Sequence, residues 1–297
     1  MTDTRVVASV RNAHKRFGDV TALDDVSFDI EENRIYGLLG RNGAGKTTIM
    51  QILTGQSWAD SGTVEVFGHS PYENAGTLSN VCFIKESQRY PDDFRVKHVL
   101  TAAARLLPRW DNDFAELLLD DFDLPTSRKV KKLSRGMTSA LGVIIGLASR
   151  APLTFFDEPY LGLDAASRQM FYDRLLEDYA ENPRTVILST HLIDEVSDLI
   201  EHVVLIDRGT VVLDDETDNL RGRTVSVSGP ATRVDEFTTG HGVVHREKLG
   251  SLARATITGH ISELERSRAR SLGLELEPVS LQQLVVSSTT NKKETVA

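Results

Sequence analysis

The run Gly40 to Thr48 constrains the fold of this chain more than any other segment. It reads Gly-Arg-Asn-Gly-Ala-Gly-Lys-Thr-Thr, so glycines stand at both ends of a loop that Lys46 and Thr47 follow. Glycines let successive backbone N–H groups turn toward phosphate oxygens, the lysine of such a loop reaches the β and γ phosphates, and the hydroxyl ligates Mg²⁺. The run therefore predicts a site for a nucleoside triphosphate.

The segments on either side of the run fit this interpretation. Residues 34–39 predict a short buried strand, and residues 46–53 predict a helix that stops at Gly55. Strand, loop and helix then follow one another in the order that a phosphate-binding loop requires. A plain glycine-rich turn is the alternative, and this order disfavours it.

Composition limits the partners and the compartment. With 297 residues the chain has room for one large or two unequal domains. A net charge of -9 gives no electrostatic reason to expect nucleic acid as a partner. The single cysteine, Cys82, excludes an internal disulfide and suits a reducing compartment, and its apolar neighbours favour burial over reactivity.

No segment of the sequence predicts that this chain is itself secreted or inserted into a membrane. Residues 1–5 lack a basic region followed by an apolar stretch, so we expect no secretory signal. The longest apolar stretch, Ala140 to Ala148, is about half of the roughly 20 residues that cross a bilayer. Any role at a membrane must therefore depend on another chain.

Hydrophobic patterns predict an α/β fold with a largely parallel sheet. The expected strands are two within residues 6–30, joined by a turn at 17–19, then residues 34–39, 62–68, 80–84, 153–158, 184–188 and 203–206. Apolar residues at helical spacing predict helices over residues 96–107, 113–119 and 171–179. Strands that alternate with helices indicate parallel pairing. The helices between residues 92 and 150 are interpreted as a helical insertion in this α/β fold.

Two further motifs lie at strand ends. The buried-type strand 153–158 ends in Asp157 and Glu158, at the edge where a nucleotide-binding sheet places its charged groups. The next strand runs into Ser189-Thr190-His191. Together with Leu133-Ser134-Arg135-Gly136-Met137, these motifs make residues 5–220 resemble the ATPase subunit of an ATP-binding cassette (ABC) transporter. That family carries Leu-Ser-Gly-Gly-Gln as a signature where this pentapeptide falls.

The resemblance implies a fold and an assembly. The fold is a P-loop ATPase over residues 5–220, with a β-rich start and a helical subdomain at about 92–150. In such proteins two ATPase domains pair head to tail, so that each ATP lies between the phosphate loop of one and the signature of the other. The residues that it implies in nucleotide binding are Phe17, Gly40, Asn42, Gly43, Ala44, Gly45, Lys46, Thr47, Thr48, Gln88, Ser134, Gly136 and Asp164.

Catalytic roles follow from chemistry and agree with the family. Asp157, with Thr47, would hold Mg²⁺, and Glu158 would polarise the attacking water as general base. Lys46 would stabilise charge that spreads over the γ-phosphoryl oxygens. His191 resembles the switch histidine of the family, which contacts the γ-phosphate.

Three of the implied contacts have a structural alternative. Ser134 is placed to cap a helix over residues 135–148, whose positive end would face an anion, but a simple helix cap has the same sequence. Asp164 matches the loop that links the two ATP sites across the dimer, and it equally suits a helix cap. Phe17 lies where the family has an aromatic ring that stacks on adenine, and packing in the core is the less favoured alternative.

Two departures from the family pattern stand out. Where the family has a glutamine that contacts Mg²⁺, this chain has Glu86 in the gapless alignment and Gln88 two residues later. Either Gln88 reaches the site by a different loop path, which we assign, or Glu86 replaces it and adds a charge that repels the γ-phosphate. Arg135 and Met137 replace Gly and Gln of the signature, as in many bacterial export ATPases.

The last part of the chain has a different pattern. Residues 223–286 predict a small α+β appendage with strands at 224–227, 243–245 and 253–257 and a helix at 261–272. Its role is open between dimer stabilisation and a regulatory ligand site. Residues 280–284 are similar to the closing helix of export subunits, and the polar tail 287–297 is expected to be disordered.

We therefore interpret the chain as the ATP-hydrolysing motor of a membrane exporter. The resemblance implies ATP and Mg²⁺ as cofactors, a separate transmembrane permease, and a second ATPase subunit in a homodimer or a paralogous heterodimer. It also implies a location at the cytoplasmic side of the cell membrane. The alternative is a soluble ABC ATPase that acts on a macromolecular assembly. An inactive regulator is disfavoured because Lys46, Asp157, Glu158 and His191 are all present.

Overall fold

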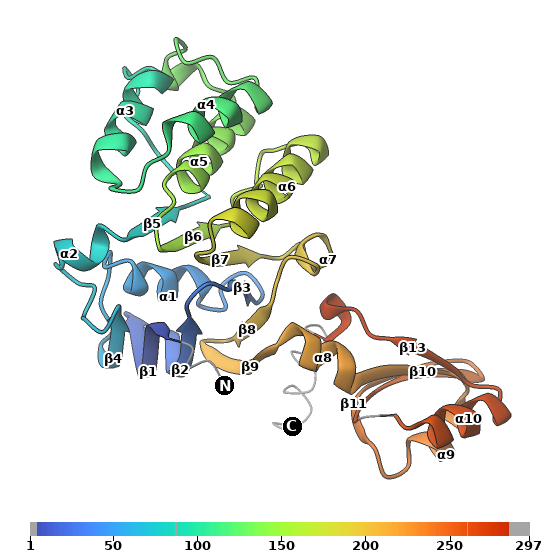
Figure 1. Ribbon diagram of the computed structural model, residues 1–297. Coiled ribbons are helices and arrows are strands. Elements are labelled where there is room, and N and C mark those ends of the chain that lie inside the picture. Colours follow the sequence, from blue (N-terminus) through green and yellow to red (C-terminus); the bar gives the residue numbers. More distant parts are fainter. Residues whose placement is uncertain (1–4, 87, 260, 285–297) are drawn as a thin grey trace. The chain divides into compact units, whose positions relative to one another are not determined.

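The computed structural model describes residues 5–86, 88–259 and 261–284 (Figure 1). The chain divides into two compact units. The first runs to His191 and includes Ile206–Val211, and the second comprises Leu192–Leu205 and the chain from Val212 onward. The domain bounds that we expect, 5–220 and 223–286, stay predictions, and the expected tail 287–297 lies outside the described residues.

The chain begins with an antiparallel sheet in the order β2-β1-β4. β1 and β2 form a long hairpin whose turn includes Gly18 at φ 58°, as the two-strand interpretation of residues 6–30 predicted. Apolar side chains of these strands, such as Val10, Leu23 and Val26, are fully buried. The strands are β1 (Val6–Phe17), β2 (Val20–Glu31) and β4 (Ser61–Val66).

A second sheet, in the order β5-β6-β7-β3-β8-β9, carries the phosphate loop. Its pairs β5–β6, β6–β7 and β3–β7 are parallel, which confirms the parallel pairing inferred from strand and helix alternation. Every residue of β3, β6 and β7 is buried, as expected of parallel strands covered on both faces. The strands are β3 (Ile35–Leu39), β5 (Val81–Ile84), β6 (Leu153–Asp157), β7 (Thr185–Thr190), β8 (His202–Asp207) and β9 (Thr210–Glu216).

Register brings the functional strand ends to one edge of this sheet. Leu39, the last residue of β3, pairs with Thr190, and Asp157 pairs with Ser189. Parallel strands present their carboxyl ends on the same side, so the phosphate loop, the acidic pair and His191 follow neighbouring strand ends.

Helices α3, α4 and α5 group together beside β5 and β6 (Figure 1). The apolar run Ala140–Ala148 lies in α5 and is buried throughout. A Cβ on Gly146 would come within 2.3 Å of the Phe156 ring, so glycine lets the helix approach the sheet. No helix in the described part of the chain is long and apolar enough to span a membrane. The helices of the first unit are α1 (Lys46–Leu53), α2 (Ala75–Leu78), α3 (Val96–Leu106), α4 (Asn112–Asp121), a 3₁₀ turn (Val130–Lys132), α5 (Arg135–Ala148) and α6 (Ala165–Glu181).

The second unit contains an antiparallel sheet in the order β11-β12-β10-β13. Strand and helix order is βαββαβ, which is the ferredoxin-like arrangement. Val227, Val234, Phe237, Ile257 and Ala269 share one core, which places α9 and α10 on the same face of the sheet. The elements are α7 (Ile193–Val196), α8 (Thr217–Arg223), β10 (Thr224–Pro230), α9 (Ala231–Thr238), β11 (Gly242–Leu249), β12 (Leu252–Thr258), α10 (Glu263–Ser271) and β13 (Glu275–Pro278).

Sequence patterns missed α9 and β13 in this unit, as well as β9 before it. Helix α9 is short and has few apolar residues, and β13 has only 4 residues and ends in a proline, so neither is long enough to carry a strong periodic signal. The interpretation of Cys82 is confirmed: it is buried in β5, and burial raises the pKa of its thiol to about 11.

Candidate functional site

The phosphate loop connects β3 to α1 around a cavity of about 460 Å³. Gly43 and Gly45 adopt φ 79° and 114°, and a Cβ on Gly45 would lie 2.6 Å from the carbonyl oxygen of Ala22. Only glycine tolerates both that conformation and that approach. The described residues that line the cavity are Val20, Thr21, Ala22, Asn42, Gly43, Ala44, Gly45, Lys46, Thr47, Thr48, Glu86, Asp157, Glu158, Leu161 and His191.

Lys46 brings a buried positive charge to this cavity. Its side chain is 7% exposed and its ammonium group donates to the carbonyl oxygen of Gly40 at 2.7 Å. Burial lowers the pKa of Lys46, while the carboxylates of Glu158 and Asp157 oppose that shift. Because Gly45 caps α1, the positive end of the helix dipole lies at the same place. The cavity therefore favours an anion that carries several charges.

Thr47 and Asp157 meet across the cavity although they lie 110 residues apart. The hydroxyl of Thr47 donates to Oδ2 of Asp157 at 2.8 Å. Asp157 is 5% exposed at the end of β6. A hydroxyl and a carboxylate oxygen are the hard ligands that Mg²⁺ prefers, so this pair fits a magnesium ion bound beside phosphate oxygens.

Glu158 lies directly beside His191. Nδ1 of His191 is 2.7 Å from Oε2 of Glu158. Glu158 adopts φ 51°, an unusual conformation for a non-glycine residue, and its N–H donates to the carbonyl oxygen of Ser189. Backbone strain of this kind clusters at functional sites. The geometry supplies a buried carboxylate and an imidazole within reach of one water molecule.

Sequence reasoning missed Tyr160, which completes this group. Its hydroxyl donates to Oε2 of Glu158 and lies 3.1 Å from Nδ1 of His191. The signal available in the sequence was its place two residues after Glu158, but tyrosine in a loop more often indicates ordinary packing.

The remaining predicted residues lie outside the cavity lining. Ser134 caps α5 by accepting from the N–H of Met137, and Asp164 caps α6 by accepting from the N–H of Ser167. That backbone hydrogen bond is the main reason why the pKa of Asp164 is lowered. Phe17 ends β1 and is 53% exposed, with the ammonium group of Lys15 at 5.5 Å from its ring centroid. Both helix caps are confirmed, and the nucleotide contacts of these residues stay predictions.

The two departures from the family pattern contact each other. Glu86 lines the cavity, whereas Gln88 is half-buried and is not among the described lining residues. Oε1 of Glu86 is 3.3 Å from Nη2 of Arg135, so the acidic substitution lies beside the basic one. Both side chains are largely exposed, and such a pair contributes little to stability. Its consequence is electrostatic, because Arg135 offsets the charge that Glu86 would present to a phosphate.

The start of α5 packs on the loop that follows the acidic pair. The hydroxyl of Ser139 donates to the carbonyl oxygen of Leu161 at 2.6 Å. A Cβ on Gly136 would lie 2.7 Å from the carbonyl oxygen of Gly162, so glycine permits this contact. The signature segment and the catalytic loop therefore form one packed group within the chain.

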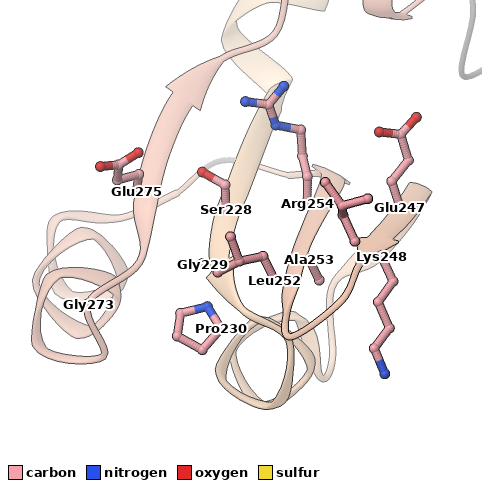
Figure 2. A pocket seen from close by; sticks show the side chains of 11 residues that line it. Ser228, Gly229, Pro230, Glu247, Lys248, Leu252, Ala253, Arg254, Gly273 and Glu275 are labelled. Atoms are coloured by element: carbon pink, nitrogen blue, oxygen red, sulfur yellow. The ribbon is translucent and has the colours of Figure 1, made fainter.

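A second cavity, of about 880 Å³, lies in the second unit among β10, β11, β12 and β13 (Figure 2). Lys248 and Arg254 line it together with Glu247 and Glu275, and Figure 2 shows the two cationic side chains pointing in different directions. These two cationic and two acidic side chains carry no net charge together. The phosphate loop, the acidic pair and His191 all lie in the first unit, so the nucleotide chemistry is assigned to the cavity there.

Comparison with known proteins identifies the family. A family model described as "ABC transporter" matches residues 23–161. The daunorubicin resistance ATP-binding protein DrrA3 of Streptomyces coeruleorubidus is 31% identical over 237 residues, which cover 75% of this chain and 72% of that protein. The chain belongs to the ABC transporter ATP-binding proteins. The Nod factor export ATP-binding protein I of Burkholderia lata is 28% identical over 281 residues, covering 89% of this chain and 88% of its own.

Solved structures agree on the fold of this ABC transporter ATP-binding protein. The ATP-binding subunit of an ABC transporter superposes with a TM-score of 0.66 at 23% identity, over 72% of this chain and 92% of that one. A dimeric ABC cassette in a post-hydrolysis state with ADP and phosphate gives 0.62 at 19% identity, over 71% and 98%. The predicted P-loop ABC fold is confirmed, and the chain is an ATP-binding, ATP-hydrolysing subunit of an ABC transporter.

Proposed function

We propose that this ABC subunit is the motor of a membrane exporter. The observation that carries the proposal is the meeting of Thr47 with Asp157 and of Glu158 with His191 around the phosphate loop. Relatives named for daunorubicin resistance and for Nod factor export favour the outward direction. A role in a soluble assembly is disfavoured, since the matching family model is described as "ABC transporter" and one of these relatives is named for export.

Hydrolysis depends on positioning and on charge neutralisation. Lys46 and the N-terminus of α1 bind the β and γ phosphates, and Thr47 and Asp157 would hold Mg²⁺. When bound, that ion neutralises negative charge on the phosphate oxygens. Glu158 takes up the proton of the attacking water, and His191 orients that water against the γ-phosphate. Phe17 stacks on adenine in this scheme.

A second subunit completes each nucleotide site in the proposal. Ser134 and Gly136 at the start of α5 of one subunit face the γ-phosphate held by the other, and Asp164 joins the two sites. ATP then closes the dimer, hydrolysis reopens it, and a permease at the membrane takes up the motion on the cytoplasmic side. Gln88 is assigned to contact Mg²⁺ and sense the permease. The alternative is that Glu86 takes this role, and the location of Glu86 in the cavity lining supports that alternative.

The first experiment measures phosphate release and dimer formation for the wild type and Glu158→Gln. We expect turnover in the wild type, its loss in Glu158→Gln, and dimers trapped by ATP in that variant. Glu177→Gln is the matched control, because this carboxylate is exposed on α6 and pairs with Arg174.

Each result has a definite meaning. Wild-type turnover that survives Glu158→Gln would contradict the role of Glu158. Binding of the protein to membranes that contain the cognate permease is measured alongside turnover. Turnover without such binding would support the soluble assembly instead.

A further inference from the structure

We propose that Tyr160 is a positioning residue for hydrolysis, which holds the carboxylate of Glu158 in place through its phenol hydroxyl. The inference rests on the proposed role of Glu158 as general base. It concerns a residue that touches neither ATP nor water in this scheme and acts through Glu158.

The hydroxyl of Tyr160 makes every hydrogen bond that a phenol offers. It donates to Oε2 of Glu158, and it accepts from the hydroxyl of Thr190 at 2.9 Å and from the N–H of His191 at 3.1 Å. A phenol has one proton and two acceptor lone pairs, so this set fixes the direction of the O–H bond. Nδ1 of His191 also lies 3.1 Å from the hydroxyl, but it is 2.7 Å from Oε2 of Glu158, so Nδ1 carries a proton toward that carboxylate and does not accept the phenol proton. Because Thr190 and His191 direct the lone pairs, the proton points at Glu158.

Burial makes this arrangement stiff. Tyr160 is 2% exposed, and the Glu158 side chain that it contacts is 10% exposed. Burial is the main reason why the pKa of Tyr160 is raised, and the hydrogen bond to Glu158 acts in the same direction. The phenol therefore keeps its proton at neutral pH and remains a donor. A hydrogen bond to an ionised group in such surroundings is stronger than one in water.

The contacts also distinguish the two oxygens of Glu158. Oε2 receives the phenol O–H of Tyr160 and lies 2.7 Å from Nδ1 of His191. With Oε2 engaged by these neighbours, Oε1 is the oxygen that remains to take the proton of the attacking water. Tyr160 thus restricts the rotation of the Glu158 carboxylate, so that one defined oxygen acts as the base. Positioning of this kind is a large part of catalysis by phosphoryl-transfer enzymes.

The test is Tyr160→Phe, which keeps the ring and removes only the hydroxyl. We expect kcat to fall roughly tenfold or more, as for the loss of one hydrogen bond to a charged group, while KM for ATP stays within about twofold. Tyr36→Phe is the matched control, since it removes a buried phenol hydroxyl that accepts from the N–H of Glu31 at the far end of β3. We expect this control to leave kcat unchanged.

A double variant separates positioning from a structural role. In the Glu158→Gln background, Tyr160→Phe should cause no further loss of the residual turnover measured in single-turnover assays, because both changes act on one proton acceptor. Losses that multiply would overturn the proposal. A kcat of Tyr160→Phe within about twofold of the wild-type value would also overturn it. The same holds if the roughly tenfold change appears in KM and kcat does not change.

Thr190→Val is a second test of the proposal, for the case in which Tyr160→Phe does not fold. It leaves the phenol in place and removes one of the groups that orient it, so we expect a smaller loss in kcat with unchanged KM. A wild-type kcat in Thr190→Val together with an unfolded Tyr160→Phe would assign Tyr160 to stability alone and overturn the proposal. Failure of the proposed function is distinguishable, since turnover would then survive Glu158→Gln whatever residue 160 is.

Discussion

Asp178 in α6 offers the sharpest test of how the first unit is held together. Asp178 is 5% exposed, and its carboxylate accepts from Arg184 at 2.5 Å and from Arg150 at 2.8 Å. Arg184 is itself 4% exposed and directly precedes β7, the strand whose other end carries His191. One carboxylate therefore joins the end of α5, the body of α6 and the start of β7.

Asp178→Ala should cost about 3–5 kcal/mol in the free energy of unfolding, because it leaves the guanidinium of Arg184 buried without its anion. Arg150 is less affected, since it keeps Asp111 at 2.6 Å. The assay is urea denaturation followed by tryptophan fluorescence. Both tryptophans, Trp58 and Trp110, lie in the first unit, so the signal reports that unit.

Asp173→Ala is the control on the same helix, because Asp173 is exposed and its carboxylate accepts a hydrogen bond from the side-chain amide of Gln169. We expect a change within about 0.5 kcal/mol for this control. Replacing Asp178 and Arg184 together with Leu and Met should recover most of the loss, since a buried ion pair exchanged for apolar side chains is often neutral. A loss below about 1 kcal/mol for Asp178→Ala would refute the reasoning.

Three further outcomes are expected. Gly146→Ala should destabilise the first unit by about 1–3 kcal/mol in the same urea assay, because the new Cβ would lie 2.3 Å from the Phe156 ring. Gly142→Ala should cost less, because its Cβ would lie 3.0 Å from a methyl group of Ile84. Lys46→Ala should lower ATP turnover by roughly a hundredfold or more in a phosphate-release assay, with an unchanged urea midpoint as evidence of folding. The hydrogen bonds from Ser262 lower the pKa of Glu265 to about 2, so its contribution to stability is complete above the unfolded value near 4.5 and is lost as pH falls toward 2. Circular dichroism should show the acid transition moving to higher pH in Ser262→Ala, and an unmoved transition would contradict this role of the capping box.

Local patterns predicted much of the fold. The hairpin of β1 and β2, the phosphate loop, the acidic end of β6 and the cap of α5 at Ser134 each depend on residues close together in the sequence. Patterns failed where an element is short or polar, as in α9 and β13, because docking on the neighbouring sheet stabilises such elements more than their own periodicity does.

The site shows the same division. The sequence by itself determined which groups are available: glycines that accept positive φ, a lysine, a hydroxyl and two adjacent carboxylates. Only the tertiary structure decided which of them meet. Thr47 reaches Asp157 across 110 residues, Tyr160 reaches Thr190 across 30, and Glu86 reaches Arg135 across 49. These contacts depend on the register of parallel strands and on how α5 packs against the sheet. Contacts of that kind arise from the packing of the whole unit, so no local spacing of residues encodes them.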